Sequence, residues 1–235
     1  MWNCPCSTDM FAKFAEDFSD IDSAPSLLML SEVASSLGVT IIGGSVPEKD
    51  AGQLYNTCCV FGPNGEFKVK HRKIHLFDMG KPLLGEVQFK ESDYISAGKN
   101  PTVVDTDFGC IGIGICHDIR FPELAMLYSA RGAQLICYPG AFNMSTGAAL
   151  WELEQRTRQD DSVSSISGSY AIWGHSTVAG PMGEIIATTG HDKTVLIVDI
   201  DYAAIQRTRE SFPLESQRRS DIYQLVDVLK ESSNF

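Results

Sequence analysis

The sequence lacks the features by which membrane and secreted proteins are usually recognised. None of its 235 residues lies in an apolar run long enough to cross a bilayer. The opening, MWNCPCSTDMF, has no basic segment followed by an apolar one, so it carries no mark of a secretory signal. Positive charge is scarce, because 19 lysines and arginines face 30 acidic residues and the net charge is −11. A nucleic-acid surface needs clustered positive charge, so that class is excluded together with a membrane partner.

Cysteine is present, but not in the arrangements that build disulfide frameworks or zinc sites. The seven cysteines are odd in number, several stand in apolar runs, and Cys4 and Cys6 form only a C-x-C pair. We therefore expect reduced thiols in a reducing compartment, which for this chain means the cytoplasm. An organelle-targeting segment upstream of Met1 is left open by the sequence.

Apolar strands alternate with amphipathic helices along the chain, and 43% hydrophobic residues are enough to bury a core. The turn signals PNG and FG each join two strand-like runs into a predicted hairpin. Residues 110–139 have a strand–helix–strand pattern, which favours a parallel pair with a right-handed crossover. No repeat or linker divides the chain, so we expect one domain over 1–235, α/β or mixed α+β in class. The pattern predicts helices at 24–37, 121–133, 148–160 and from 202, strands at 39–46, 53–61, 66–73, 102–107, 110–116 and 134–140, a serine-rich loop at 161–171 and a β-meander over 171–201.

Cys116 stands where an apolar strand ends, in the stretch GIGICHDIRFPELA. A packed core cysteine is the ordinary alternative. The position favours a nucleophile, because open α/β sheets bind ligands at the carboxyl ends of their strands and a helix N-terminus lowers the pKa of a thiol. The backbone N–H of His117 is placed to face an oxyanion. A direct pair between the side chains of Cys116 and His117 is not expected, since neighbours on extended backbone point to opposite sides.

Lys73 and Glu91 are further candidates with ordinary alternatives. Lys73 lies in KVKHRKIHLFD, where the basic run by itself indicates an exposed strand end. The apolar residues that follow draw the chain back towards the core, so this lysine is suited to hold a developing negative charge. Glu91 lies in VQFKESDYISAG and by itself reads as a surface carboxylate on a loop. His71 and His75 share no face without a helix, so metal ligation is not expected.

Several long stretches, in order and well spaced, together resemble the nitrilase, or carbon–nitrogen hydrolase, superfamily. The similarity extends from about Trp2 to the C-terminal RRSDIYQLVDV. Within the superfamily the chain most resembles the omega-amidase branch, because AFNMSTG followed by WELEQR favours it over the branch that acts on deaminated glutathione. The stretches are HRKIHLFD (71–78), GICHDIRFPELA (114–125), YPGAFNMSTG (138–147), WELEQRTR (151–158) and WGHSTVAGPMGE (173–184).

The resemblance implies an α-β-β-α sandwich, a Glu–Lys–Cys triad and a homodimer. Matched residue by residue, Cys116 is the nucleophile, Lys73 is the lysine, and Glu91 is a further glutamate that positions the lysine and the substrate. Cys116 is then expected to attack a side-chain carboxamide, while Lys73 and the His117 N–H stabilise the oxyanion; ammonia leaves and water hydrolyses the thioester. The expected substrates are short ω-amides of dicarboxylic acids, such as 2-oxoglutaramate and 2-oxosuccinamate. No metal or organic cofactor is expected.

The chain departs from the family pattern in two places. In the family, a general-base glutamate ends a strand in an L-P-E pattern immediately before the stretch that matches MWNCPCS. We therefore expect this base and the opening strand–helix–strand to be missing from 1–235. After Arg158, a short serine-rich stretch replaces a core strand, so we expect an incomplete sandwich and impaired turnover. The alternatives are a deaminated-glutathione amidase and a catalytically inactive nitrilase-like protein that binds or assembles with partners.

Overall fold

The structure, a computed structural model, describes residues 1–5, 7–80, 89–158 and 173–231. Its strands are β1 (Glu16–Asp17), β2 (Ile41–Asp50), β3 (Gln53–Phe61), β4 (Phe67–Arg72), β5 (Thr102–Thr106), β6 (Gly109–Ile113), β7 (Leu135–Cys137), β8 (Thr177–Ala179) and β9 (Ile185–Thr188). Its helices are η1 (Thr8–Met10), α1 (Phe11–Phe14), η2 (Ile21–Ser23), α2 (Pro25–Leu37), η3 (Glu91–Asp93), η4 (Cys116–Arg120), α3 (Pro122–Ala130), α4 (Met144–Arg158), α5 (Tyr202–Ser211) and α6 (Val228–Glu231), where η marks a 3₁₀ turn. None of the helices in these ranges is long and apolar enough to cross a membrane.

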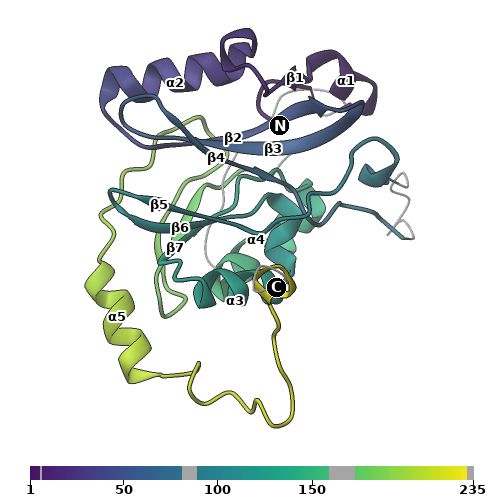
Figure 1. The fold of residues 1–235 in the computed structure, drawn as a ribbon. Coiled ribbons are helices and arrows are strands. Elements are labelled where there is room, and N and C mark those ends of the chain that lie inside the picture. Colours follow the sequence, from purple (N-terminus) through teal and green to yellow (C-terminus); the bar gives the residue numbers. More distant parts are fainter. Residues whose placement is uncertain (6, 81–88, 159–172, 232–235) are drawn as a thin grey trace.

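The first sheet has the order β1-β2-β3-β4, and α2 covers its outer face (Figure 1). The helix begins at Pro25, whose fixed φ suits a first turn, and ends at Gly38, which adopts a left-handed φ of 64°. Its buried side chains pack on the strands in one cluster with Cys59 and Phe61. Residues 62–66 close the β3–β4 hairpin as the PNG signal predicts.

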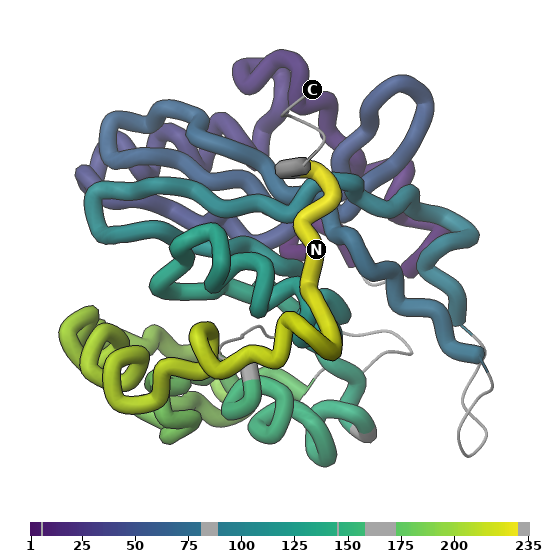
Figure 2. Tube along the Cα trace, turned by 60° about the horizontal axis from the view of Figure 1, so that its bottom comes forward, coloured from purple at the N-terminus to yellow at the C-terminus, as the bar shows by residue number. Residues whose placement is uncertain are grey.

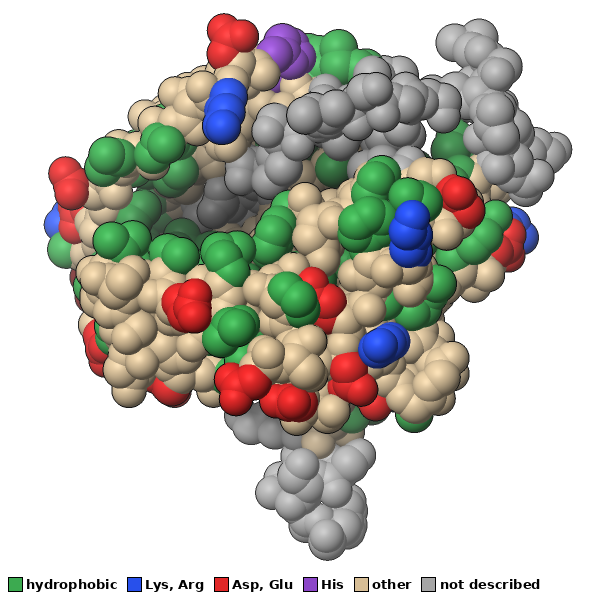
Figure 3. Space-filling view, turned by 90° about the horizontal axis from the view of Figure 1, so that it is seen from above, with side chains coloured by type: hydrophobic (Ala, Val, Ile, Leu, Met, Phe, Trp, Pro, Cys, Tyr) green, Lys and Arg blue, Asp and Glu red, His purple; other side chains and the backbone are tan. Residues whose placement is uncertain are grey.

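The face of the molecule that is seen from above in Figure 3, on the side where α2 lies, carries apolar side chains as well as acidic ones. Met29, Val33 and Leu37 are the exposed large apolar residues of this helix. Single exposed apolar residues are normal on soluble proteins, so this face by itself indicates no partner.

The second sheet has the order β5-β6-β7, with β5 and β6 antiparallel and β6 and β7 parallel. Helix α3 makes the crossover between β6 and β7 and covers the outer face of this sheet. Helix α3 packs closely against β6 at Gly112, where a Cβ would lie 2.8 Å from the Tyr128 ring. The Tyr128 hydroxyl also donates to the carbonyl of Ile113 at 2.5 Å. The predicted parallel strand–helix–strand unit is confirmed.

The two sheets face each other across an apolar layer. Cys58 and Val60 of β3 pack against Val104, Ile111 and Ile113 of the second sheet, all of them buried. With α2 outside one sheet and α3 outside the other, the layers run helix, sheet, sheet, helix. This is the α-β-β-α sandwich that the family resemblance implies.

Element ends differ from the sequence prediction in places, and one predicted strand is wrong. Helix α4 begins four residues before the expected start, and β2 continues to Asp50 because it pairs with β3 along that length. The β-meander has two strands among the described residues, β8 and β9. Residues 194–201 form no strand in the described structure, and Val195 and Ile197 are 84% and 90% exposed. Their alternation is typical of a strand, but a strand also needs a neighbour to pair with. The predicted loop at 161–171 and the departure after Arg158 lie outside the described residues.

The C-terminal part returns towards the sandwich after α5, and Figure 2 shows it passing back along the molecule. Two arginines bind it to the α3 region. Arg209 donates to the carbonyl of Ala133 at 2.9 Å, and Arg131 forms a bidentate pair with Asp227 at 2.8 Å for each bond. The tail is therefore attached near the end of the crossover helix.

Candidate active site

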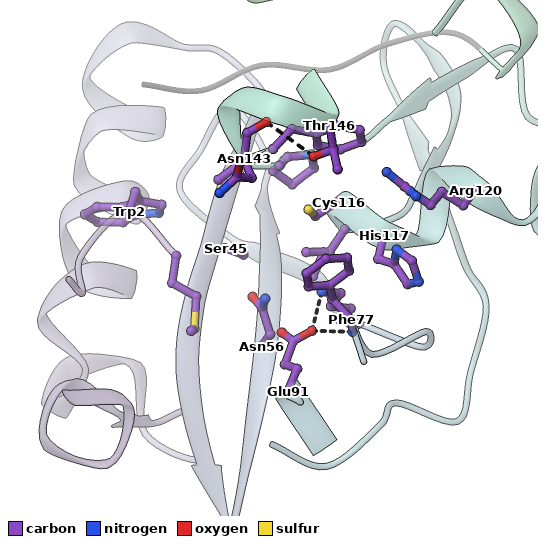
Figure 4. Close-up of a pocket in the computed structure, with 18 of the residues that line it drawn as sticks. Trp2, Ser45, Asn56, Phe77, Glu91, Cys116, His117, Arg120, Asn143 and Thr146 are labelled. Carbon is purple, nitrogen blue, oxygen red and sulfur yellow. Dashed lines mark hydrogen bonds and ion pairs between the residues drawn. The ribbon is translucent and has the colours of Figure 1, made fainter. Parts of the chain in front are cut away.

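A pocket of about 190 Å³ opens beside the turn that follows β6. Its wall comes from β2 and β3, from the segments that follow β4, β6 and β7, and from the first turn of α4 (Figure 4). Cys116, Lys73 and Glu91 all line it, so the structure brings the three predicted side chains into one cavity. Aromatic rings of Trp2, Phe77, Phe89 and Phe142 form much of the remaining wall.

Cys116 occupies a strained turn. Its φ is 48°, a left-handed value that non-glycine residues rarely adopt. The turn is fixed by the Cys116 N–H, which donates to the carbonyl of Pro139 at 2.9 Å, and by the neighbouring Gly114, where a Cβ would overlap the Tyr138 ring. The sequence prediction of a helix N-terminus at Cys116 needs correction, because the residue begins the short turn η4 and α3 starts only at Pro122.

Asp118 ties this turn to β4 and to the segment directly after β4, which begins with Lys73. Its buried carboxylate accepts from the Ile115 N–H at 2.9 Å and from the His75 N–H and Nδ1 at 2.8 and 2.7 Å. It also lies 3.3 Å from His71 Nε2. Burial alone would raise the pKa of Asp118, but the hydrogen bonds from His71 and His75 hold it well below its usual value. The two histidines that share no helix face are therefore joined through one carboxylate.

Lys73 and Glu91 form a buried ion pair, with 2.5 Å between Nζ and Oε2. The side chains are almost fully enclosed, and the Phe77 N–H also donates to Glu91 Oε2 at 2.8 Å. Burial alone would lower the pKa of Lys73, but the charges of Glu91 and Cys116 raise it above its ordinary value. The lysine is therefore a cation at neutral pH. The interpretation of Glu91 as a surface carboxylate is wrong, because the segment after β4 folds over it.

The His117 ring lies away from the thiol of Cys116 (Figure 4). It packs edge-on against Phe77 and Phe121, with centroids 5.2 and 5.5 Å away. Burial, with the nearby charges of Lys73 and Arg120, lowers the pKa of His117 to about 4. The ring is neutral at pH 7 and makes no bond to Cys116 in the described structure, so only the backbone N–H of His117 is available to a ligand at the thiol.

Sequence analysis missed polar residues that complete the pocket wall. Arg120 lies there with its Nε 3.3 Å from Glu154 Oε1 and its guanidinium 5.5 Å from the Phe142 ring centroid. The position of Arg120 in the polar run directly after Cys116 could have identified it from the sequence as a pocket residue. Asn143 directly precedes α4 and Thr146 lies in its first turn, and the Thr146 hydroxyl donates a hydrogen bond to the Asn143 carbonyl. Asn56 lies in the middle of β3, and nothing in the local sequence distinguishes it.

The site thus places the Cys116 thiol, on a strained turn, in one pocket with the buried Lys73–Glu91 pair of an α-β-β-α sandwich. The chain belongs to the carbon–nitrogen hydrolase family, whose model matches residues 1–210. The predicted superfamily and the similarity to its omega-amidase branch are confirmed by the relatives.

The chain is similar to the chloroplastic omega-amidase of Arabidopsis thaliana, with 55% identity over 99% of this chain and 65% of that protein. It is 48% identical to omega-amidase NIT2 of Xenopus tropicalis, over 96% of this chain and 83% of that protein. Among solved structures, Nit3 of Saccharomyces cerevisiae is similar with a TM-score of 0.82 and 36% identity, over 92% of this chain and 79% of that one. The chain thus spans a little less than two thirds of the length of its plant relative.

Proposed function

We propose that this protein is an omega-amidase-type hydrolase that releases ammonia from the terminal carboxamide of short dicarboxylic acid amides. The observation that carries the proposal is the pocket in which the Cys116 thiol meets the buried Lys73–Glu91 pair. The similarity to two omega-amidases supports the substrate class. Substrates of this class include 2-oxoglutaramate and 2-oxosuccinamate.

In the proposed reaction, Cys116 sulfur attacks the carboxamide carbon and the carbonyl oxygen becomes an oxyanion. Lys73, kept protonated by Glu91, and the backbone N–H of His117 stabilise that oxygen. The carbon–nitrogen bond then breaks and ammonia leaves with the proton that came from the thiol. Water next attacks the thioester and releases the acid.

A carboxylate base must carry the proton from sulfur to nitrogen. Glu91 is the only carboxylate among the described residues that line the pocket, and its Oε2 is engaged by Lys73 and the Phe77 N–H. We therefore assign Glu91 to holding the lysine. The proton transfer belongs to the glutamate that the family carries on the strand leading into the stretch that matches MWNCPCS.

Arg120 supports a substrate with a carboxylate at its far end. It is the second cation in the described pocket wall, and among the described residues only Glu154 pairs with it, through Nε. Its two Nη groups are available for a bidentate pair with a carboxylate. Arg120 and Cys116 lie on the same short turn η4 and line the same pocket, which suits a short substrate with a carboxylate at the end opposite its carboxamide.

The test is ammonia release from 2-oxoglutaramate by residues 1–235 joined to a preceding strand that carries the family's base glutamate, which serves as the wild-type protein, and by its Cys116→Ala variant. Loss of all turnover in Cys116→Ala is expected, because no other group is placed to form the thioester. Cys110→Ala is the matched control, since Cys110 lies at the start of β6 away from the pocket. Turnover that survives in Cys116→Ala would overturn the proposal. Faster cleavage of deaminated glutathione than of 2-oxoglutaramate would instead identify the protein as a deaminated-glutathione amidase.

A further inference from the structure

Asn56 presents a buried side-chain oxygen that has no hydrogen-bond partner among the described residues. Its side chain is 7% exposed and lines the pocket. Within the described ranges, no group makes a hydrogen bond to its Oδ1. Buried side-chain amides are normally hydrogen-bonded, and those left without a partner at a pocket wall call for an explanation.

The position of Asn56 is fixed next to the reacting groups. Its backbone carbonyl accepts from the Lys73 N–H at 2.8 Å, so β3 holds it beside the lysine. Side chains alternate along a strand, and Asn56 shares its face with Cys58, which faces the second sheet. Figure 4 shows the Asn56 side chain beside Glu91, with Arg120 on the other side of Cys116. The amide therefore lies at the end of the pocket opposite the proposed carboxylate site.

The proposed substrate has only one kind of hydrogen-bond donor. At neutral pH its carboxylate and its carbonyl oxygens accept hydrogen bonds, and its carboxamide nitrogen alone carries hydrogens. We infer that Asn56 Oδ1 accepts a hydrogen bond from the substrate's carboxamide nitrogen and so makes the site select amides over esters of the same acid. The inference rests on the proposed function. It assigns Asn56 to binding the leaving nitrogen, separately from the oxyanion contacts of Lys73 and His117.

The consequence of this contact is a leaving-group preference. An amide and a methyl ester of one acid form the same thioester with Cys116 and differ only in the group that departs. The Asn56 oxygen, as an acceptor beside the carboxamide nitrogen, stabilises the complex of the protein with the amide. The ester has no N–H to donate to it. Removing the acceptor should therefore lower turnover of the amide alone.

The experiment compares kcat/KM for 2-oxoglutaramate and for the 5-methyl ester of 2-oxoglutarate in the wild-type protein, Asn56→Leu and Asn56→Asp. In Asn56→Leu we expect kcat/KM for the amide to fall about 10- to 100-fold, the scale of one buried hydrogen bond, with little change for the ester. Asn56→Asp retains an acceptor oxygen and should recover much of the preference for the amide. Asn100→Leu, on an exposed segment outside the pocket wall, is the control and should leave the ratio unchanged.

The results separate the inference from the proposed function. An equal fall for amide and ester in Asn56→Leu would overturn the inference, since it would mean that Asn56 serves the oxyanion or only supports Lys73. An unchanged amide rate would also overturn it. A wild-type protein that releases neither ammonia nor methanol would defeat the proposed function, and the inference with it. If Asn56→Leu does not fold, the amide-to-ester ratio in Asn56→Asp decides, because loss of the preference there contradicts the acceptor role.

Discussion

The positive charge of Lys73 is the residue-scale feature on which the proposed chemistry depends most. Lys73→Met should lower kcat about 100- to 1,000-fold with a smaller change in KM, because the charge stabilises the oxyanion more than the bound amide. Steady-state ammonia release measures both constants. Lys70→Met is the matched control, since Lys70 lies on the opposite face of β4 and pairs with Glu48. A change confined to KM would show that Lys73 only binds substrate.

Asp118 is expected to govern both the stability of the protein and the shape of the thiol turn. Asp118→Asn removes the charge that His71, His75 and the Ile115 N–H all face. We expect it to lower the free energy of unfolding by about 3 kcal/mol and to reduce ammonia release. Denaturant unfolding measures the first effect. Asp192→Asn, on an exposed turn, should change neither quantity.

The same carboxylate predicts a pH dependence. Its folded-state pKa lies below the ordinary value of 3.8, so its stabilisation is present above that pH and is lost as the pH falls further. The unfolding free energy should therefore decline more steeply below about pH 4 in the wild-type protein than in Asp118→Asn. If the unfolding free energy declined equally steeply below about pH 4 in both proteins, the stabilising role of the ionised Asp118 would be contradicted.

At the scale of elements, the sequence predicted what local chemistry determines. Pro25 and Gly38 bound α2, PNG closes a hairpin, and residues 110–139 form the crossover unit. Contacts between segments that are distant in the sequence could not be predicted from these local patterns. The joining of His71 and His75 through Asp118 spans more than forty positions, and the burial of Glu91 depends on a segment that has no regular pattern.

Close packing behind the thiol turn gives an element-scale prediction. Gly114→Ala should destabilise the protein by about 1–3 kcal/mol, because the new Cβ would meet the Tyr138 ring. It should also reduce turnover, since Cys116 is only two residues away. Gly190→Ala, which has open space at its Cβ, is the control. Thermal unfolding of the two variants gives the comparison, and equal stability would show that the turn tolerates the methyl group.

At the scale of the whole molecule, we predict a homodimer formed through the face that carries α3. Ala125, Met126 and Leu127 are only partly buried there. Light scattering should give the mass of two chains at micromolar concentration, and Leu127→Glu should lower it. Val33→Glu, on the exposed face of α2, should leave the mass unchanged. A single-chain mass for the wild-type protein would contradict the prediction.

The distribution of cysteines has a consequence for chemical labelling. None of the six described cysteines forms a disulfide. Burial raises the pKa of Cys58 to about 12 and that of Cys59 far above its ordinary value, so neither supplies a thiolate at neutral pH. Cys116 is partly exposed in the pocket beside the ammonium of Lys73, which attracts anionic reagents. Iodoacetate should therefore modify Cys116 before the other described cysteines. The amount of carboxymethyl group bound per chain when turnover stops would then give the fraction of chains that have an active site.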